Sequence, residues 1–299
     1  MRPVLQALLV TFLWSTSWVL IRIGLADIPP VTFAGLRYIL AFGVLLVVWW
    51  RQPGRTHLNT LTRGDWLWLL AYGLVYYALT QGSQFVGLAL LPAITFSLLL
   101  NFSAVFVALM GIPFLKEHLS AVQWSGILVF LFGVGFYFWP NLIPVGMALG
   151  LAVGMFSTLA GSISAVMGRF INRAAKMDAL TVTVVSMGIG AASMLAGGLA
   201  FEPFPRISPA NWVLLLWLAV VNTAFAFWLW NHTLRSLTAT QSNMINNTML
   251  VQIAVLAWLF LGETPTGLQI IGMAVVTFGA VLVNWPGKKP PALAPQEMA

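Results

Sequence analysis

The sequence contains few charged residues and no cysteine. Asp, Glu, Lys and Arg make up only 7% of its 299 residues, against about 25% in soluble domains, and 60% of the residues are hydrophobic. So few charges cannot cover a water-exposed surface of this size, and the composition therefore fits a protein surrounded by lipid. The lack of cysteine excludes disulfide bonds, a thiolate metal site and a cysteine nucleophile.

Acidic residues and histidines are missing from the middle of every long apolar run. A proton-coupled carrier usually keeps an ionisable carboxylate or imidazole on its path. We therefore expect facilitated diffusion, or coupling through the substrate's own charge. The acidic residues lie at the ends of the runs or in loops: Asp27, Asp65, Glu117, Asp178, Glu202, Glu263 and Glu297.

Catalytic motifs are also missing. The sequence has no HExxH, no GxSxG and no paired acids at depth, so we expect no enzyme activity, no catalytic residue, no metal site and no cofactor. The net charge of +7 does not indicate nucleic-acid binding, because Lys and Arg are spread singly or in small groups between apolar runs. That spacing is typical of topology signals in membrane proteins.

Ten apolar runs dominate the sequence. A helix that crosses about 30 Å of hydrocarbon needs roughly 20 apolar residues, and each run reaches that length. We therefore predict an all-α membrane protein with ten transmembrane helices, followed by a disordered cytoplasmic tail at residues 287–299, which are rich in Pro and Lys. The runs cover residues 4–24, 31–50, 66–88, 92–112, 121–139, 144–168, 179–201, 210–231, 237–261 and 266–285.

The distribution of Lys and Arg predicts the orientation. If the N-terminus lies in the cytoplasm, eleven of these residues fall on the inner side, whereas Arg206 and the helix-end Arg22 remain outside. Under the positive-inside rule, both termini are therefore expected in the cytoplasm.

The second half of the chain repeats the first. A shift of 146 residues aligns residues 114–140 with residues 260–286 without a gap, with ten identities in 27 positions, and carries Asn101 onto Asn247. We predict a repeat of five helices at residues 1–140 and a second one at residues 141–286. Because five is odd, the second repeat enters the membrane from the opposite side, and such inverted repeats are the basis of alternating access.

Polar side chains inside the predicted helices indicate a central cavity. They are costly in lipid unless they face a partner or a water-filled space, and here they recur at helical spacing near the membrane centre. We expect the first four helices of each repeat to line the cavity. The fifth helices, at 121–139 and 266–285, carry almost nothing polar and should lie outside it. The candidate substrate-binding residues are Trp14, Ser17, Arg37, Tyr38, Tyr77, Gln81, Asn101, Ser157, Asn222, Asn243, Asn246 and Asn247.

Alternatives remain open for these residues. Any single Asn, Ser or Thr can instead form a hydrogen bond between helices. Arg37, the basic residue well inside a span, can snorkel to the outer interface, bind a substrate carboxylate, or hold carbonyls and aromatic rings at the cavity mouth. The lack of an acid in any span centre favours the substrate carboxylate.

Two pairs of glycines occupy equivalent places in the fifth helices. Gly126 and Gly133 are seven residues apart, and so are Gly272 and Gly279. Small residues let helix backbones approach closely in a membrane, so we expect helix contacts at these positions.

Several segments resemble the EamA family of the drug/metabolite transporter superfamily. They are WSTSWVLIRIGL at residues 14–25, PPVTFAGLRYILAF at residues 29–42, and the Glu before each fifth helix, Glu117 and Glu263. The resemblance covers about residues 4–286. It implies a multi-pass protein of the bacterial inner membrane that exports amino acids, aromatic or neutral ones first, and related metabolites from a central cavity. Its partners would be a small-molecule solute and the lipid bilayer, and it would be a monomer or weak homodimer.

The arginine motif of that family falls on Arg37. The equivalent helix of the second repeat has Thr183 and Ser186 as its polar groups and no arginine, so we do not expect a symmetric role for Arg37. Competing hypotheses are a carrier of another metabolite, such as a nucleoside, polyamine or sugar conjugate, an intramembrane enzyme, or a channel. Saturable counterflow of a labelled solute distinguishes a carrier from a channel.

Overall fold

Helices joined by loops make up the part of the chain that the structure describes. The computed structural model describes residues 2–115, 119–139, 145–173, 176–203, 205–234, 237, 245–246 and 248–285, and these residues contain no strand. The expected cytoplasmic tail, residues 287–299, lies outside the described residues.

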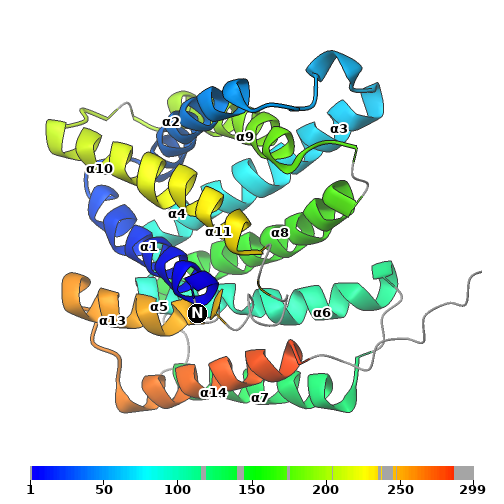
Figure 1. Cartoon of the computed structure of the whole chain (residues 1–299). Helices are drawn as coiled ribbons and strands as arrows, with labels where there is room; N and C mark the ends of the chain where they lie inside the picture. Colours follow the sequence, from blue (N-terminus) through cyan, green and yellow to red (C-terminus); the bar gives the residue numbers. More distant parts are fainter. Residues whose placement is uncertain are drawn as a thin grey trace, which may run out of the picture.

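The helices follow the predicted apolar runs closely (Figure 1). Several runs are divided into shorter helical pieces, as described below. In chain order the elements are α1 (Arg2–Gly24), α2 (Pro30–Arg51), η1 (Leu58–Thr60), α3 (Arg63–Tyr72), η2 (Gly73–Gln81), α4 (Gly82–Leu90), α5 (Ala93–Leu100), α6 (Phe102–Leu115), α7 (Ala121–Phe138), η3 (Val145–Met147), α8 (Ala148–Arg173), α9 (Ala179–Phe201), α10 (Pro209–Ala219), η4 (Val220–Phe225), α11 (Ala226–Leu234), α13 (Met249–Leu261) and α14 (Gly267–Val283).

Among the residues that the structure describes, six helices are long and apolar enough to cross a membrane. They cover Pro3–Gly24, Pro30–Arg51, Ala93–Met110, Ala121–Phe138, Ala148–Gly168 and Ala179–Phe201. Shorter apolar helices lie at Pro209–Phe225, Met249–Leu261 and Gly267–Val283. Large apolar side chains on the outside, such as Phe201 (91% exposed) and Phe132 (69%), fit a surface that faces lipid. The number of ten spans and the division into two repeats remain predictions.

Two predicted spans contain a π-helical stretch. In η2 the Thr80 hydroxyl donates to the Val75 carbonyl at 2.8 Å, and in η4 the Thr223 hydroxyl donates to the Leu218 carbonyl, also at 2.8 Å. Each bond reaches back five residues. The two stretches lie in the third and eighth predicted spans, about 146 residues apart. Stretches of this kind loosen the regular helix and occur often at functional sites.

The fourth predicted span, which continues as one apolar helix over Ala93–Met110, has a local irregularity at Asn101. The helix there divides into α5 and α6, and the Asn101 side chain donates through Nδ2 to the Ser97 carbonyl at 2.8 Å. Interrupted helices are common around the binding sites of transporters. The repeat-related Asn247 lies outside the described residues.

The α7 and α14 helices pack along one edge of the molecule, at the bottom of Figure 1. A Cβ added at Gly133 would lie 2.6 Å from the Val276 backbone nitrogen, and one at Gly279 would lie 2.5 Å from that of Phe130. Both distances are shorter than a van der Waals contact, so only glycine permits this approach. The helix contact predicted from these glycines is confirmed.

The α2 and α9 helices form another close pair, at the opposite edge (Figure 1). A Cβ added at Gly35 would lie 2.7 Å from the backbone of Leu195. The Glu202 carboxylate, just after α9, accepts hydrogen bonds from the backbone N–H groups of Val31 at 3.0 Å and Thr32 at 2.7 Å. A carboxylate from another helix thus caps the first turn of α2.

A second acidic cap lies at the start of α5. The Glu263 carboxylate accepts from the backbone N–H groups of Ala93 at 2.7 Å and Ile94 at 3.0 Å. Because α5 follows Pro92 and no side chain of its own caps it, the loop before α14 supplies the missing acceptor.

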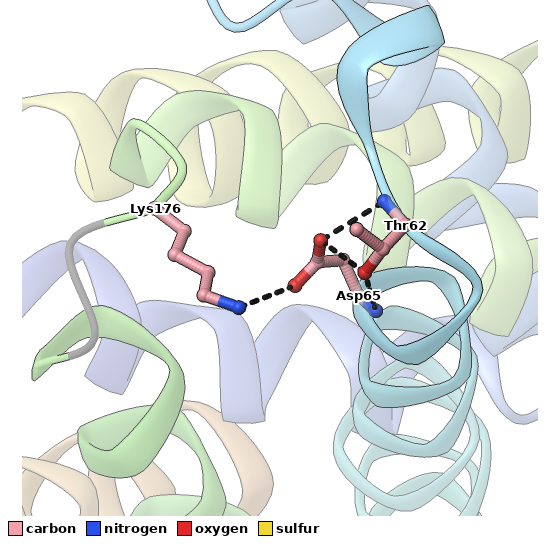
Figure 2. A network of polar contacts seen from close by, with 3 residues as sticks. All are labelled: Thr62, Asp65 and Lys176. Carbon is pink, nitrogen blue, oxygen red and sulfur yellow. Dashed lines mark hydrogen bonds and ion pairs between the residues drawn. The ribbon is translucent and has the colours of Figure 1, made fainter.

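The start of α3 and the loop before it meet the segment between α8 and α9 (Figure 2). Asp65 Oδ2 accepts from the Thr62 hydroxyl at 2.6 Å and from its backbone N–H at 3.0 Å, while Lys176 Nζ lies 3.6 Å from Asp65 Oδ1. The hydrogen bonds from Thr62, together with Lys176, hold the pKa of Asp65 below its usual value.

Asp178 makes a second contact between the same two loops. It accepts from the Thr56 backbone N–H at 2.9 Å, and it also caps α9 through the Thr181 backbone N–H at 3.0 Å. Burial raises the pKa of Asp178, but the hydrogen bonds from Thr181 and Thr56 outweigh it and hold the pKa at about 2. These contacts place the loop that contains Arg55 and the end of α8 at the same end of the molecule.

Candidate functional site

A cavity of about 470 Å³ lies between the two halves of the chain. Binding pockets for small molecules have volumes of about 300–1,000 Å³, so a metabolite fits here. Side chains from α1, α2, η2, α4, α5, α6, α8, η4, α11 and α13 line the cavity, whereas no described residue of α7 or α14 does. The two helices expected to lie outside the cavity do so.

The wall of the cavity differs from the expectation at α9. We expected residues 179–201 to line it, but no described residue of α9 reaches it. A Cβ on Gly73 would lie 2.6 Å from the Ser186 carbonyl oxygen, and one on Gly190 would lie 2.3 Å from Tyr77 Cβ. The backbones of α9 and η2 are therefore in direct contact, and no space remains between them for a solute.

Arg37 is buried in the cavity wall, with 6% of its surface exposed. Its Nε donates to Thr223 Oγ1 at 3.0 Å, and one terminal nitrogen lies 3.5 Å from Ser17 Oγ. The guanidinium also lies 5.6 Å from the centre of the Tyr38 ring and 6.0 Å from that of Phe85. The snorkelling alternative is wrong, because the side chain turns inward to a hydroxyl of η4.

The charge of Arg37 has no acidic partner among the described residues. The one ion pair found in that part of the chain joins Lys176, between α8 and α9, to Asp65 in the first turn of α3. Hydroxyls and aromatic rings compensate a buried cation only in part. An anionic group that enters the cavity would complete the compensation, and the planar guanidinium matches a carboxylate in two-point geometry.

Most of the candidate residues come together around this cavity. Tyr77 does not line it, because its ring packs against Tyr38 and Tyr76, at 5.7 Å and 4.8 Å between ring centres. Asn243 and Asn247 lie outside the described residues. The candidates that line the cavity are Trp14, Ser17, Arg37, Tyr38, Gln81, Asn101, Ser157, Asn222 and Asn246.

Some of the polar candidates also hold helices together. Ser157 of α8 donates to the Thr80 carbonyl at 3.1 Å, and its neighbour Thr158 donates to the Leu99 carbonyl at 3.2 Å. Both readings considered from the sequence, cavity and interhelical bond, therefore apply to Ser157. These bonds fix α8 against η2 and α5 around the cavity.

Aromatic rings form much of the remaining wall. Trp14 packs against Phe227 at 5.5 Å between ring centres, and Trp18 packs against Phe96 at 5.5 Å. Rings in a cavity wall favour solutes with an apolar or aromatic part. No group of three or more His, Asp or Glu that could hold a metal ion occurs within the described ranges.

Thr223 is a hydrogen-bond partner of Arg37 that the sequence pattern does not single out. It follows Asn222 directly, but a hydroxyl next to a candidate amide gives no signal by itself. The π-helical turn of η4 brings the Thr223 hydroxyl to Arg37, and such a turn is not visible in the apolar pattern.

Comparison with known proteins identifies the family. The model of the EamA-like transporter family matches residues 1–139 and 148–285. Among similar proteins, a "probable amino-acid metabolite efflux pump" of Escherichia coli K12 is 28% identical over 287 residues, covering 91% of each chain. An uncharacterized transporter, YoaV, of Bacillus subtilis is 24% identical over 90% of this chain and 92% of its own.

A crystal structure shares the fold. It superimposes with a TM-score of 0.64 at 17% identity and covers 93% of this chain and 96% of its own. The family model spans nearly the whole sequence, in agreement with the apolar helices and the central cavity described above. The chain therefore belongs to the EamA-like transporter family, and it is a multi-pass protein of the inner membrane, as the bacterial members of that family are.

Proposed function

We propose that the chain is an alternating-access carrier that exports amino acids, aromatic and neutral ones first, across the inner membrane. The observation that carries this proposal is Arg37, a buried cation in the cavity wall with no acidic partner among the described residues. A substrate carboxylate supplies the missing charge, and it is stabilised there because charge-assisted hydrogen bonds contribute about 1.5–3 kcal/mol each.

The wall around Arg37 supports the side-chain preference. Trp14, Trp18 and Phe85 offer ring surfaces to an apolar side chain, while acids are absent from the residues that line the cavity in the described part of the chain. A polyamine is disfavoured because its positive charges would be repelled by Arg37. A relative in Salmonella typhimurium, 26% identical, is also named a probable amino-acid metabolite efflux pump, and this supports amino-acid export.

Alternating access follows from the proposed inverted repeats. The two stretches matched by the family model, the two π-helical stretches and the shared end of the loops at Thr56 and Asp178 all support this organisation. In this arrangement both termini lie in the cytoplasm, and re-packing of one half against the other opens the cavity to each side in turn.

Counterflow in proteoliposomes tests the proposal. Vesicles that contain the purified protein are loaded with unlabelled phenylalanine and diluted into labelled phenylalanine, threonine, uridine or putrescine. We expect saturable uptake of phenylalanine that depends on the loaded solute. Non-saturable flux would indicate a channel, and stronger counterflow of uridine or putrescine would contradict amino-acid export.

A further inference from the structure

The side-chain oxygen of Asn222 lacks a hydrogen-bond donor in the part of the chain that the structure describes. Asn222 is fully buried in η4 and belongs to the cavity wall. Its Nδ2 donates to the Leu13 carbonyl and to Thr16 Oγ1, the latter at 3.0 Å. Because the Leu13 carbonyl can only accept, it fixes the amide with Nδ2 toward α1, and Oδ1 is left as a free acceptor.

Arg37, in the wall of the same cavity, has unused donors. Arg37 Nε donates to Thr223 Oγ1, one residue from Asn222, and a guanidinium has five N–H donors in all. The bonds to Thr223 and Ser17 use only two of the five. The wall of one cavity therefore contains both a cation with spare donors and a buried carbonyl oxygen that lacks a donor.

We propose that Arg37 and Asn222 together read the two charged ends of a zwitterionic α-amino acid. The carboxylate accepts from Arg37, and the ammonium donates to Asn222 Oδ1. This inference rests on the proposed function and narrows it. The cavity selects the pair of groups, so a solute that carries the carboxylate alone, or the amine alone, binds more weakly.

The rest of the wall fits the remainder of an amino acid. Trp14 lines the cavity and packs at a tilt against Phe227 and Trp230, at 5.5 Å and 5.2 Å between ring centres. Such rings accept an apolar or aromatic side chain, while the polar groups on η4 and α2 hold the α-carbon substituents. A buried acceptor that lacks a donor is costly, so satisfying Oδ1 adds to the binding of an ammonium group.

Competition experiments on the reconstituted protein test this inference. Counterflow of labelled phenylalanine is measured in the presence of one of three unlabelled competitors. Phenylalanine carries both charged groups, N-acetylphenylalanine lacks the ammonium, and phenethylamine lacks the carboxylate. For the wild-type protein we expect half-inhibition by phenylalanine at concentrations about tenfold or more below those of the two analogues. Equal inhibition by phenylalanine and N-acetylphenylalanine overturns the inference without any variant.

The variant Asn222→Leu tests whether the amide of Asn222 causes the preference for phenylalanine over N-acetylphenylalanine. It is expected to weaken inhibition by phenylalanine about tenfold and to leave N-acetylphenylalanine unchanged. Thr16→Val is the matched control, because it removes one partner of Nδ2 but keeps Oδ1, and the preference for phenylalanine should persist. If Asn222→Leu weakens both ligands equally, Asn222 only supports the fold and the inference is wrong. If the wild-type protein transports no amino acid, the proposed function fails as well.

Discussion

The guanidinium of Arg37 joins two parts of the chain that are 186 residues apart. Its bond to Thr223 connects α2 of the first half with η4 of the second, and Arg37 itself lines the cavity. A lysine at this position would offer one ammonium in place of a planar fork, so it could not hold Thr223 and a carboxylate in the same geometry. Arg37 is thus expected to link solute binding with the contact between the halves.

Substitution of Arg37 tests this role. We expect Arg37→Gln to lower the counterflow of phenylalanine about tenfold or more, and Arg37→Lys to recover only part of it, because the charge alone does not restore two-point binding. Arg55→Gln is the control. Arg55 lies in the loop after α2, over the rings of Trp49 and Trp50 and away from the cavity, so this substitution should leave transport unchanged. Normal counterflow by Arg37→Gln would contradict the proposed site.

Nine of the twelve residues predicted from the sequence line the cavity, because polar side chains are rare and costly inside apolar runs. Asn101 and Asn222 were found in this way, and both line the cavity. Tyr77 was chosen on the same helical stripe but faces the α9 backbone, since its Cβ lies beside Gly190. The sequence could not reveal this, because a tyrosine on a polar stripe packs or binds with the same pattern.

Helix contacts through glycine dominate at the scale of the elements. The α7–α14 pair has backbone contact at Gly133, whereas Gly135, two residues later on the same helix, has no atom within 4 Å of an added Cβ. The two glycines therefore offer a matched pair of positions in one helix.

We predict opposite effects of alanine at these two positions. Gly133→Ala forces the α7 and α14 backbones apart and should lower stability by about 1–3 kcal/mol, as overpacking does. Gly135→Ala meets no atom and should leave stability unchanged or raise it by up to about 1 kcal/mol, because alanine favours the helix. Thermal unfolding of the purified protein in detergent measures both, and equal effects of the two variants would contradict the contact.

Asp178 gives a prediction on pH dependence. Its pKa in the folded protein is about 2, below the ordinary value of 3.8, so its charged form stabilises the folded state. That contribution is present above about pH 4 and is lost as the pH falls toward 2. Because the carboxylate is partly open to solvent, we expect a contribution of only about 1 kcal/mol.

The variant Asp178→Asn isolates this charge, since an amide still caps α9 through its oxygen. Its unfolding temperature should lie a few degrees below that of the wild-type protein at pH 7, and the difference should shrink between about pH 4 and pH 2. A difference that stays constant over this range would show that the charge of Asp178 does not contribute.

The apolar pattern predicts where the helices lie but not where they depart from regular α-helix. The apolar runs located the helical segments, because a run of roughly 20 apolar residues has few other structures in lipid. The π-helical stretches of η2 and η4 were not predicted, because they change which carbonyl a given N–H bonds to and leave the apolar pattern unaltered. The close contact of α9 with η2 was missed for a related reason: glycine permits it, but only the three-dimensional packing shows which backbone approaches.

At the scale of the whole molecule, the carrier hypothesis depends on the orientation of the two halves. The contacts of Asp178 with Thr56 and of Lys176 with Asp65 place two loops at one end of the molecule, as the distribution of basic residues predicts for the cytoplasmic side. The proposed inverted repeats require this arrangement, whereas two parallel five-helix units would place these loops on opposite sides.

Cysteine labelling tests this topology directly, because the chain contains no cysteine of its own. In inside-out vesicles we expect Arg55→Cys and Arg173→Cys to react with a membrane-impermeant maleimide, and Arg206→Cys to react only in intact cells or right-side-out vesicles. Reaction of Arg55→Cys and Arg173→Cys from opposite sides would refute the inverted arrangement.

The backbone contacts of Gly73 and Gly190 between η2 and α9 give the two halves of the chain unequal shares in the cavity wall. One wall presents Arg37, while its repeat-related counterpart is closed by direct backbone contact. In a passive carrier built this way, the cytoplasm-facing and outward-facing forms cannot be mirror images of equal energy. The concentration for half-maximal flux should therefore differ between the two faces, while the ratio of maximal rate to that concentration stays the same, because a gradient of solute is the sole source of free energy.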